Sequence, residues 1–299
     1  MQIETVFTAT TTNAAEQDNL FELDASQFRD NFNRQPFLIT HHLNHHPLFS
    51  LPELIELSKR MPAEDVSYNV GDVSVGQGLY KCPQNGLSIQ ETIAQIENCH
   101  SWMVIKRVSK DPQYRELLHA CLDEIGKCSE PVEGGMCARE GFIFISSPGS
   151  VTPYHMDPEY NFLLQIRGEK TINIFDPADR AMLSEIELED FYASDETANL
   201  TYKDEYQQKA QQFDLTPGLG LHFPVTAPHW VKNGNEVSIS FSITFDTPAS
   251  ERRRVVYTTN ARLRKLGLTP RPYGQSAWRD ALKFNAYRVQ RRARRLLRK

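Results

Sequence analysis

Three residues in the second half of the chain have the types and spacing of a metal-binding set. His155 and Asp157 stand one residue apart in a polar loop that begins at Ser147, and His229 follows much later in the chain. Two imidazoles and one carboxylate form the facial triad that holds non-haem Fe(II) and leaves coordination positions open for a chelating co-substrate and dioxygen. His-x-Asp alone is a weak motif. His222 is a second candidate for the distal histidine, because alternation along its strand could point it to either face.

Short β-strands are expected to position these residues. A strand at 141–145 leads into the His155 loop. The apolar run 161–166 and the run 170–175 are joined by a turn at Gly168 and predict a hairpin. Residues 215–245 predict a strand, the His229 segment, a tight turn at Asn233-Gly234 and an alternating final strand.

The first half of the chain predicts helices and two further strands. Ser-x-x-Glu capping boxes at Ser50 and Ser88 open amphipathic helices, and Asp111-Pro112 begins a helix that runs to about Gly126. Strands are expected at 36–40 and 101–108, and residues 1–20 predict a loose arm or a short edge strand. The histidines of HHLNHH (41–46) could bind a divalent metal, but no carboxylate accompanies them, and a solvated turn is the favoured interpretation.

The composition is typical of a globular protein whose cysteines are free thiols. Of 299 residues 40% are hydrophobic, with 16 Phe and 11 Tyr, which is enough for a full core. No run approaches the ~20 apolar residues of a membrane span, and the N-terminus does not have the pattern of a secretory signal. Five cysteines without a Cys-x-x-Cys pair predict free thiols, and therefore a cytoplasmic protein.

The second half of the chain resembles the JmjC-type, cupin-like 2-oxoglutarate oxygenases, and most closely the asparaginyl hydroxylase of the hypoxia pathway. The resemblance is strong over about residues 139–247. It rests on His155, Asp157 and the positions that match the family around them: Thr152, Asn161, Lys170, Pro217-Gly218, Phe223-Pro224 and His229-Trp230. It implies a mainly β fold with α flanks, a double-stranded β-helix (jelly roll). The expected domain is 1–250, with N-terminal helical support over about 20–135 and a barrel core over about 139–247.

The resemblance also implies roles for these residues. His155, Asp157 and His229 are the expected Fe(II) ligands, and His222 is then a pocket-lining or core histidine. Lys170 points inward by alternation with Ile172 and Ile174, and is expected to bind the distal carboxylate of 2-oxoglutarate, with Thr152 adding a hydroxyl. Asn161 and Ser242 match positions that contact the carboxylate near the metal. The hypoxia-pathway hydroxylase has asparagine at the second of these positions, which weakens the match there.

The implied reaction is oxidative decarboxylation of 2-oxoglutarate, coupled to hydroxylation or N-demethylation of a protein side chain or a small metabolite. A non-catalytic cupin-like binding module and a jumonji-type regulatory module are the alternatives. The polar segment 178–214 would lie over the barrel mouth as a substrate lid, or form a surface excursion that does not contact the substrate.

The C-terminal residues form a basic helical extension, expected over 251–299. Residues 1–251 carry 17 Lys+Arg against 37 Asp+Glu, whereas residues 252–299 carry 16 against 1. From Ser276 an apolar stripe recurs at three- and four-residue steps: Trp278, Leu282, Ala286, Val289, Ala293 and Leu296. We expect the stripe to pack within the chain or against a second copy as a homodimer. Arginines around it could meet nucleic acid or an anionic surface.

Overall fold

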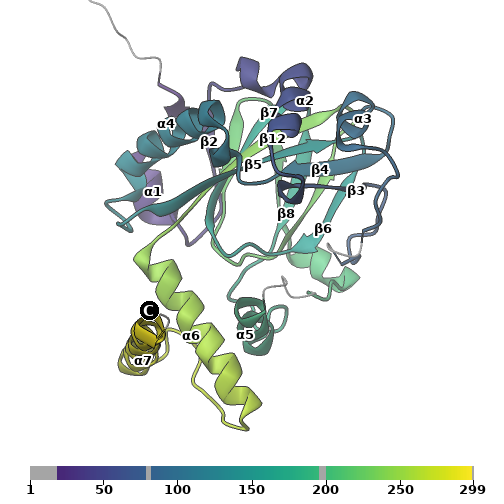
Figure 1. Cartoon of the computed structure of the whole chain (residues 1–299). Coiled ribbons are helices and arrows are strands. Elements are labelled where there is room, and N and C mark those ends of the chain that lie inside the picture. The colour runs from purple at the N-terminus through teal and green to yellow at the C-terminus, as the bar shows by residue number, and fades with distance from the viewer. Residues whose placement is uncertain (1–18, 79–81, 195–199, 298–299) are drawn as a thin grey trace, which may run out of the picture.

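The computed structural model describes residues 19–78, 82–194 and 200–297, and it consists of two antiparallel sheets with helices around them (Figure 1). The larger sheet has eight strands in the order β1-β2-β10-β7-β12-β5-β4-β3. Their bounds are β1 Phe21–Glu22, β2 Phe37–His41, β3 Val66–Val70, β4 Ser101–Ile105, β5 Cys137–Ser146, β7 Tyr160–Arg167, β10 Leu219–His222 and β12 Ser238–Asp246. The smaller sheet has the order β6-β11-β8-β9, with β6 Val151–His155, β8 Lys170–Ile174, β9 Gln211–Leu215 and β11 His229–Asn233.

From β5 onward the chain passes repeatedly between the two sheets. Strands β5, β7, β10 and β12 belong to the larger sheet, and β6, β8, β9 and β11 to the smaller one. This is the expected double-stranded β-helix, a jelly roll. The predicted hairpin is therefore wrong: β7 pairs with β10 and β12, while β8 pairs with β11 and β9. The turn at Gly168 carries the chain across from one sheet to the other.

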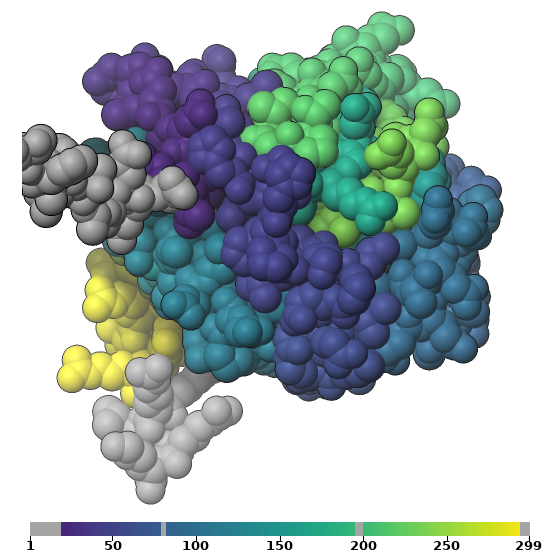
Figure 2. Space-filling view, turned by 90° about the horizontal axis from the view of Figure 1, so that it is seen from above, coloured from purple at the N-terminus to yellow at the C-terminus, as the bar shows by residue number. Residues whose placement is uncertain are grey.

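In the described N-terminal part of the chain, four α-helices cover the outer face of the larger sheet. They are α1 Ala25–Asn31, α2 Leu51–Arg60, α3 Ile89–Ala94 and α4 Pro112–Ser129. Their buried side chains, such as Phe28, Leu57 and Leu118, share one core with apolar residues of β7 and β12. Seen from above, the N-terminal residues cover much of the surface, and the C-terminal helix emerges at its edge (Figure 2). The expected helical support is thus present, because one face of an antiparallel sheet must be buried against another layer.

Helix caps differ in part from expectation. Ser88 and Glu91 form the predicted capping box, with both reciprocal hydrogen bonds. Ser50 is the N-cap residue of α2 but makes no side-chain hydrogen bond there, so the capping box predicted at Ser50 is wrong. Two further boxes are present, at Ser184 and at Thr247.

Alternation along β12 separates a polar face from an apolar one. Ile239, Phe241, Ile243 and Phe245 join the core beneath the helices. The residues between them carry hydroxyl groups and are also buried: Ser238, Ser240, Ser242 and Thr244. Successive side chains of a strand point to opposite faces. The hydroxyls therefore lie on the inner face of the sheet, where Ser240 donates to Gln165 at 2.7 Å.

The C-terminal part forms two helices, α6 Pro248–Lys265 and α7 Ala277–Leu297, which lie side by side below the strands (Figure 1). Helix α6 packs on α5 (Glu185–Ala193) and buries Val255, Val256 and Tyr257. The expected domain boundary between residues 250 and 251 falls inside α6. Among the residues described, no helix is long and apolar enough to cross a bilayer.

The expected stripe on α7 does not pack within the chain. Trp278, Leu282 and Val289 are 66%, 63% and 69% exposed. Helix α7 contacts α6 through its opposite face, where Lys283 Nζ donates to Asn260 Oδ1 and Asp280 is buried. The side chain of Leu296 and residues 1–18 lie outside the part of the chain that the structure describes.

Candidate metal and co-substrate site

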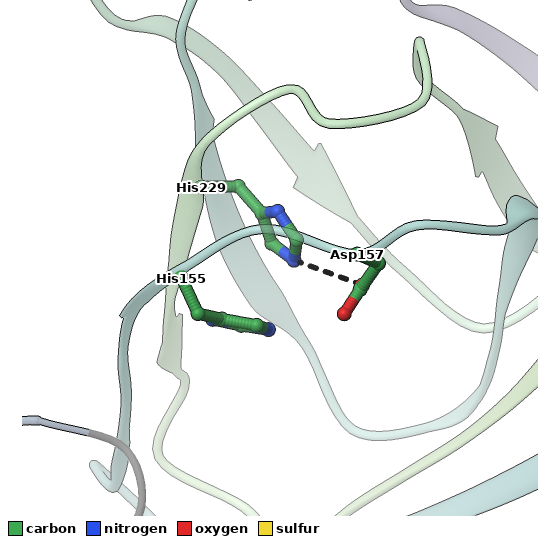
Figure 3. A group of neighbouring side chains, drawn as sticks. All are labelled: His155, Asp157 and His229. Atoms are coloured by element: carbon green, nitrogen blue, oxygen red, sulfur yellow. Dashed lines mark ion pairs between the residues drawn. The ribbon is translucent and has the colours of Figure 1, made fainter. Parts of the chain in front are cut away.

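Two neighbouring strands of the smaller sheet bring the three expected ligands together (Figure 3). His155 is the last residue of β6 and His229 the first of β11, and they are paired across these antiparallel strands. Asp157 follows β6 on the loop. The ligand atoms of the three side chains all lie within 4.8 Å of one another. The site thus takes two ligands from strand ends and one from a loop.

Hydrogen bonds to the backbone orient both imidazoles. His155 Nδ1 lies 2.7 Å from the carbonyl oxygen of Pro153, and His229 Nδ1 lies 3.0 Å from that of Ala227. A carbonyl oxygen only accepts, so each Nδ1 carries the proton and each Nε2 has a free lone pair. His229 Nε2 lies 3.6 Å from Asp157 Oδ2. Both rings are therefore prepared as metal ligands through Nε2.

The loop before His229 holds the aspartate. Thr226 donates its backbone N–H to the carbonyl oxygen of Asp157 at 3.0 Å. Thr226 has φ 64°, an unusual conformation for a β-branched residue. The ring of Phe223 lies 4.7 Å from that of His229. Burial, and to a smaller extent the neighbouring His155, lowers the pKa of His229 to about 4, so this imidazole is neutral at pH 7 and can bind a metal.

A pocket of about 50 Å³ lies directly beside the three ligands. All seven residues expected at the site line it: Thr152, His155, Asp157, Asn161, Lys170, His229 and Ser242. The sequence did not indicate several of its other lining residues, such as Phe144, Ser146 and Leu163. Phe144 and Ser146 lie on β5, and alternation along that strand was the signal that could have identified them.

Among the described residues that line this pocket, Lys170 is the one Lys or Arg, and it is 6% exposed. Within the described parts of the chain its ammonium has no hydrogen bond and no ion pair. Burial lowers the pKa of Lys170 to about 7. Burying a charge is costly unless a partner is present, so the pocket favours an anionic ligand.

Three neutral polar side chains around Lys170 also lack partners among the described residues. Asn161 is buried on β7, and its Oδ1 has no hydrogen bond. No side-chain hydrogen bond joins Thr152 or Ser242 to any described residue. Buried polar groups are nearly always satisfied. The pocket therefore has the hydrogen-bonding capacity for a small polar ligand.

His222 lies on the other side of the larger sheet. Its ring is packed 4.7 Å from that of Phe32 and 4.8 Å from that of Phe162. Nδ1 is 2.7 Å from the carbonyl oxygen of Asn161, and Nε2 accepts the N–H of Asn33. Both nitrogens are engaged, and burial lowers the pKa of His222 to about 4. It is a core histidine.

A wider cleft of about 690 Å³ adjoins the pocket. Part of its wall comes from β3 and β4, which extend the larger sheet, and includes Ser67, Asn69, Trp102 and Val104. The indole N–H of Trp102 is buried without an acceptor in the described structure. Sequence reasoning missed this wall, because nothing in the local pattern at 66–70 or 101–105 indicates that these strands join the barrel.

The segment 178–214 does not line either cavity in its described residues. Tyr192, Tyr202 and Tyr206 pack instead with Tyr154 and Tyr257, against β6 and α6. The lid interpretation is therefore not supported, and the segment is not a surface excursion either, because Leu183, Leu188 and Phe191 are buried and β9 pairs with β8. None of the histidines in HHLNHH joins a metal-binding group among the residues described, and all five cysteines are free.

A jelly roll with a His-Asp-His site at one end defines the class of this protein. The chain belongs to the cupin-like domain family, whose pattern matches residues 25–251. Lysine-specific demethylase 8 of Xenopus tropicalis is 30% identical over 105 residues, which are 32% of this chain and only 22% of that protein.

Solved structures of the Escherichia coli protein YcfD share the fold. One has a TM-score of 0.53 at 15% identity and covers 91% of this chain and 68% of its own. Another, described as a ribosomal oxygenase in complex with cobalt and 2-oxoglutarate, has a TM-score of 0.51 at 15% identity, with 90% and 67% covered.

Proposed function

We propose that the protein is an Fe(II)- and 2-oxoglutarate-dependent oxygenase that hydroxylates or N-demethylates its substrate. The observation that carries this proposal is that Lys170, buried and without a partner among the described residues, lies in the same pocket as three converging metal ligands. A dianionic co-substrate would satisfy the ammonium and the polar groups around it. Family membership and the complex of YcfD with cobalt and 2-oxoglutarate support the choice of ligand.

The donor set fits Fe(II). Nε2 of His155, Nε2 of His229 and a carboxylate oxygen of Asp157 would hold the metal and leave positions open for co-substrate and dioxygen. Bound Fe(II) and 2-oxoglutarate together supply dioxygen activation, with release of succinate and carbon dioxide. Lys170 and Thr152 would bind the distal carboxylate, and Asn161 and Ser242 the carboxylate near the metal. The apolar lining from Phe144, Leu163 and Val231 would limit the entry of water.

We place the substrate in the wider cleft. The small pocket has no room for a further substrate, whereas the cleft reaches the metal ligands and is much larger. Its size, and the partial match to lysine-specific demethylase 8, support a protein side chain rather than a small metabolite. If the oxidised carbon is an N-methyl group, the substrate is demethylated. If it is a side-chain carbon, the product stays hydroxylated.

A non-catalytic cupin-like binding module is one alternative. A jumonji-type regulatory module that acts on chromatin or nucleic acid is another. Both would retain a pocket, but neither requires three metal ligands with Nε2 prepared and a buried cation beside them. Nothing in the described structure favours nucleic acid as a partner, and that role stays a prediction, as does a cytoplasmic location.

The test combines binding and turnover. We expect anaerobic addition of Fe(II) and 2-oxoglutarate to give a metal-to-ligand absorption band, and exposure to air to give succinate without added substrate. His155→Ala, Asp157→Ala and His229→Ala should abolish both. His45→Ala should keep both, because His45 is exposed and lines neither cavity. Retained turnover in any of the three ligand variants would contradict the assignment. Binding without turnover in the wild type would favour the module.

A substrate screen follows from the same protein. Incubation with peptide libraries and detection of mass gains of one oxygen, or losses of one methylene, would identify the reaction by mass spectrometry. A change on free metabolites alone would contradict the choice of a protein substrate.

A further inference from the structure

Strand β4 presents two side-chain donors without acceptors to the wider cleft. Trp102, Val104 and Lys106 all line this cleft, whereas Met103 and Ile105 between them are buried in the core, as alternation along a strand requires. The indole N–H of Trp102 is buried and makes no hydrogen bond in the described structure. Lys106, which directly follows β4, is half-buried, and its ammonium has neither a hydrogen bond nor an ion pair with any described residue. Burial lowers the pKa of Lys106, and no neighbouring carboxylate among the described residues raises it.

The fold holds the backbone of Lys106 in place and leaves its ammonium unpaired. Its N–H donates to the carbonyl oxygen of Asp65 at 2.7 Å, which continues the pairing of β3 with β4. Arg107 then has φ 53°, in the left-handed region, and the strand has ended. The buried carboxylate of Asp65 pairs with Arg107 and with Lys110. The nearby carboxylate is thus engaged by two other cations.

Strand register places Lys106 close to the metal and co-substrate site. Ile105 pairs with Ile143 across β4 and β5. Lys106 therefore lies opposite Phe142, which pairs with Ser242 on β12. Ser242 lines the small pocket beside the metal ligands. Neighbouring strands are about 4.8 Å apart, so the backbone of Lys106 is about 10 Å from that of Ser242.

The two donors are far enough apart to require an extended ligand. Trp102 and Lys106 are four residues apart on one strand, which corresponds to about 13 Å. A small metabolite at the metal would not reach both, whereas a peptide would. The neutral indole N–H suits a carbonyl oxygen, and the ammonium suits a carboxylate, because charge-assisted hydrogen bonds are the stronger ones. An extended peptide advances about 3.3 Å per residue, so the group near Lys106 lies within about three residues of the oxidised one.

We propose that Lys106 is a specificity-determining residue that binds a carboxylate of a peptide substrate. This inference rests on the proposed oxygenase function and narrows its substrate class. The carboxylate is either an Asp or Glu side chain near the oxidised residue or the C-terminus of the peptide, which offer the same chemistry. The indole N–H of Trp102 donates to a carbonyl oxygen of the same peptide.

Charge along the cleft gives such a peptide one direction. Glu159 is on the loop between Asp157 and β7, and it lines the same cleft. Strand β7 is three strands from β4 in the larger sheet, in the order β7-β12-β5-β4. A carboxyl group at that end does not attract a substrate carboxylate, whereas the ammonium of Lys106 does. The carboxylate end of the substrate therefore points toward β4 and away from the metal ligands.

Peptide binding to the full chain tests the role of Lys106 without catalysis. The probes are fluorescent dodecapeptide pools with amidated C-termini, one containing Asp and Glu and one with Asn and Gln in their place. Fluorescence anisotropy should show at least about tenfold tighter binding of the acidic pool. Lys106→Met should bring this ratio close to one, and Lys106→Glu should favour a pool that contains Lys instead. Lys59→Met, a change at an exposed lysine of α2, should keep the wild-type ratio.

A third pool, with Asn and Gln side chains and a free C-terminus, distinguishes the two sources of the carboxylate. Tight binding of this pool would assign the C-terminal carboxylate, and tight binding of the amidated acidic pool alone would assign a side chain. Melting temperatures of both Lys106 variants equal to that of the wild type would show that the fold is kept. Equal binding of all pools by the wild type, or an unchanged preference in Lys106→Met, would overturn the inference.

Turnover separates this inference from the proposed function. Mass spectrometry of the preferred pool should find a carboxylate within about three residues of the oxidised residue, and Lys106→Glu should replace that preference by one for Lys or Arg. Oxidation with no carboxylate preference would overturn the role of Lys106 and leave the oxygenase intact. No succinate formation by the wild type, together with a pool preference that Lys106→Met removes, would overturn the oxygenase assignment and leave the carboxylate site intact.

Discussion

Lys170 carries the co-substrate assignment at the scale of single residues. Lys170→Met should raise the apparent KM for 2-oxoglutarate by about 10- to 150-fold, because a hydrogen bond to a charged group contributes about 1.5–3 kcal/mol. Fe(II) affinity should change little, since the lysine is not a ligand. Succinate formation at varied 2-oxoglutarate measures the effect. Lys232→Met, an exposed lysine on neighbouring β11, is the control, and equal KM values in the two variants would exclude the role.

The same lysine predicts a pH dependence. Burial lowers its pKa from 10.5 in the unfolded chain to about 7 in the folded one. Below pH 7 the buried ammonium is charged, and its desolvation lowers the free energy of unfolding by the full amount. As pH rises from 7 toward 10.5 the folded chain carries the neutral amine, so the free energy of unfolding increases over that range. Binding of the dianion needs the charged form. Affinity for 2-oxoglutarate should therefore fall above about pH 7, and calorimetry on Lys170→Met should show a flatter profile.

His222 should matter for stability and not for the metal. His222→Ala removes a buried ring and two hydrogen bonds, and we expect a loss of about 2–4 kcal/mol in the free energy of unfolding. The pKa of His222 is lowered to about 4 in the folded chain. The contribution of His222 to the free energy of unfolding is therefore fully present above pH 6.5 and is lost as pH falls toward 4. Urea titrations at pH 5 and 7 measure this, with His45→Ala as an exposed control. Loss of Fe(II) binding without loss of stability would contradict it.

At the scale of elements, the turn between β7 and β8 connects the two sheets. Gly168 has φ 67°, and a Cβ there would lie 2.5 Å from the backbone oxygen of Val237. Gly149 has nearly the same φ, 68°, but nothing lies within 4 Å of its Cβ position. A comparison of alanine variants at Gly168 and Gly149 therefore separates the free-energy cost of the backbone conformation from that of a steric clash.

Gly168→Ala should therefore cost more than Gly149→Ala. We expect about 1–2 kcal/mol for the left-handed conformation at either position, and an additional 1–3 kcal/mol or so at Gly168 from overpacking. Chemical denaturation of both variants measures the difference. Affinity for 2-oxoglutarate should fall in Gly168→Ala only, because Lys170 begins β8 two residues later. Equal destabilisation would show that the turn has room to move.

At the scale of the whole molecule, α6 joins the C-terminal extension to the domain. Arg264 of α6 donates two hydrogen bonds to the buried carboxylate of Glu189, at 2.7 and 2.9 Å. Val255 and Val256 are buried in the same helix. The division into 1–250 and 251–299 stays a proposal, and these contacts predict how truncation would test it.

A chain ending at Ser250 should be much less stable than one ending at Leu268. The shorter chain loses the buried valines, each contributing about 1.5–3 kcal/mol, and leaves Glu189 buried without its partner. The longer chain keeps α6 and loses only α7. Thermal melting should therefore show a large loss for the first and a small one for the second. Equal melting temperatures would make all of 251–299 a separable extension.

Residue types and their spacing could be interpreted from the sequence alone. Iron binding requires particular ligand types and an anionic co-substrate requires a cation, so His155, Asp157 and Lys170 could be proposed without coordinates. The family resemblance then favoured His229 over His222. Alternation along strands then indicated which residues face inward, as it did for Lys170. The jelly roll was expected from the resemblance, and the β-rich pattern agreed with it.

Long-range contacts could not be predicted from local sequence patterns. Strands β7 and β8 looked like a hairpin, but strand partners depend on segments far apart in the chain, and each strand joined a different sheet. The placement of His222 in the core, of the described residues of 178–214 away from both cavities, and of β3 and β4 at the wider cleft depended on the same contacts. The stripe on α7 was visible as a pattern, but a periodic pattern shows only which residues share a face. Packing against α6 through the opposite face decided that this stripe is exposed.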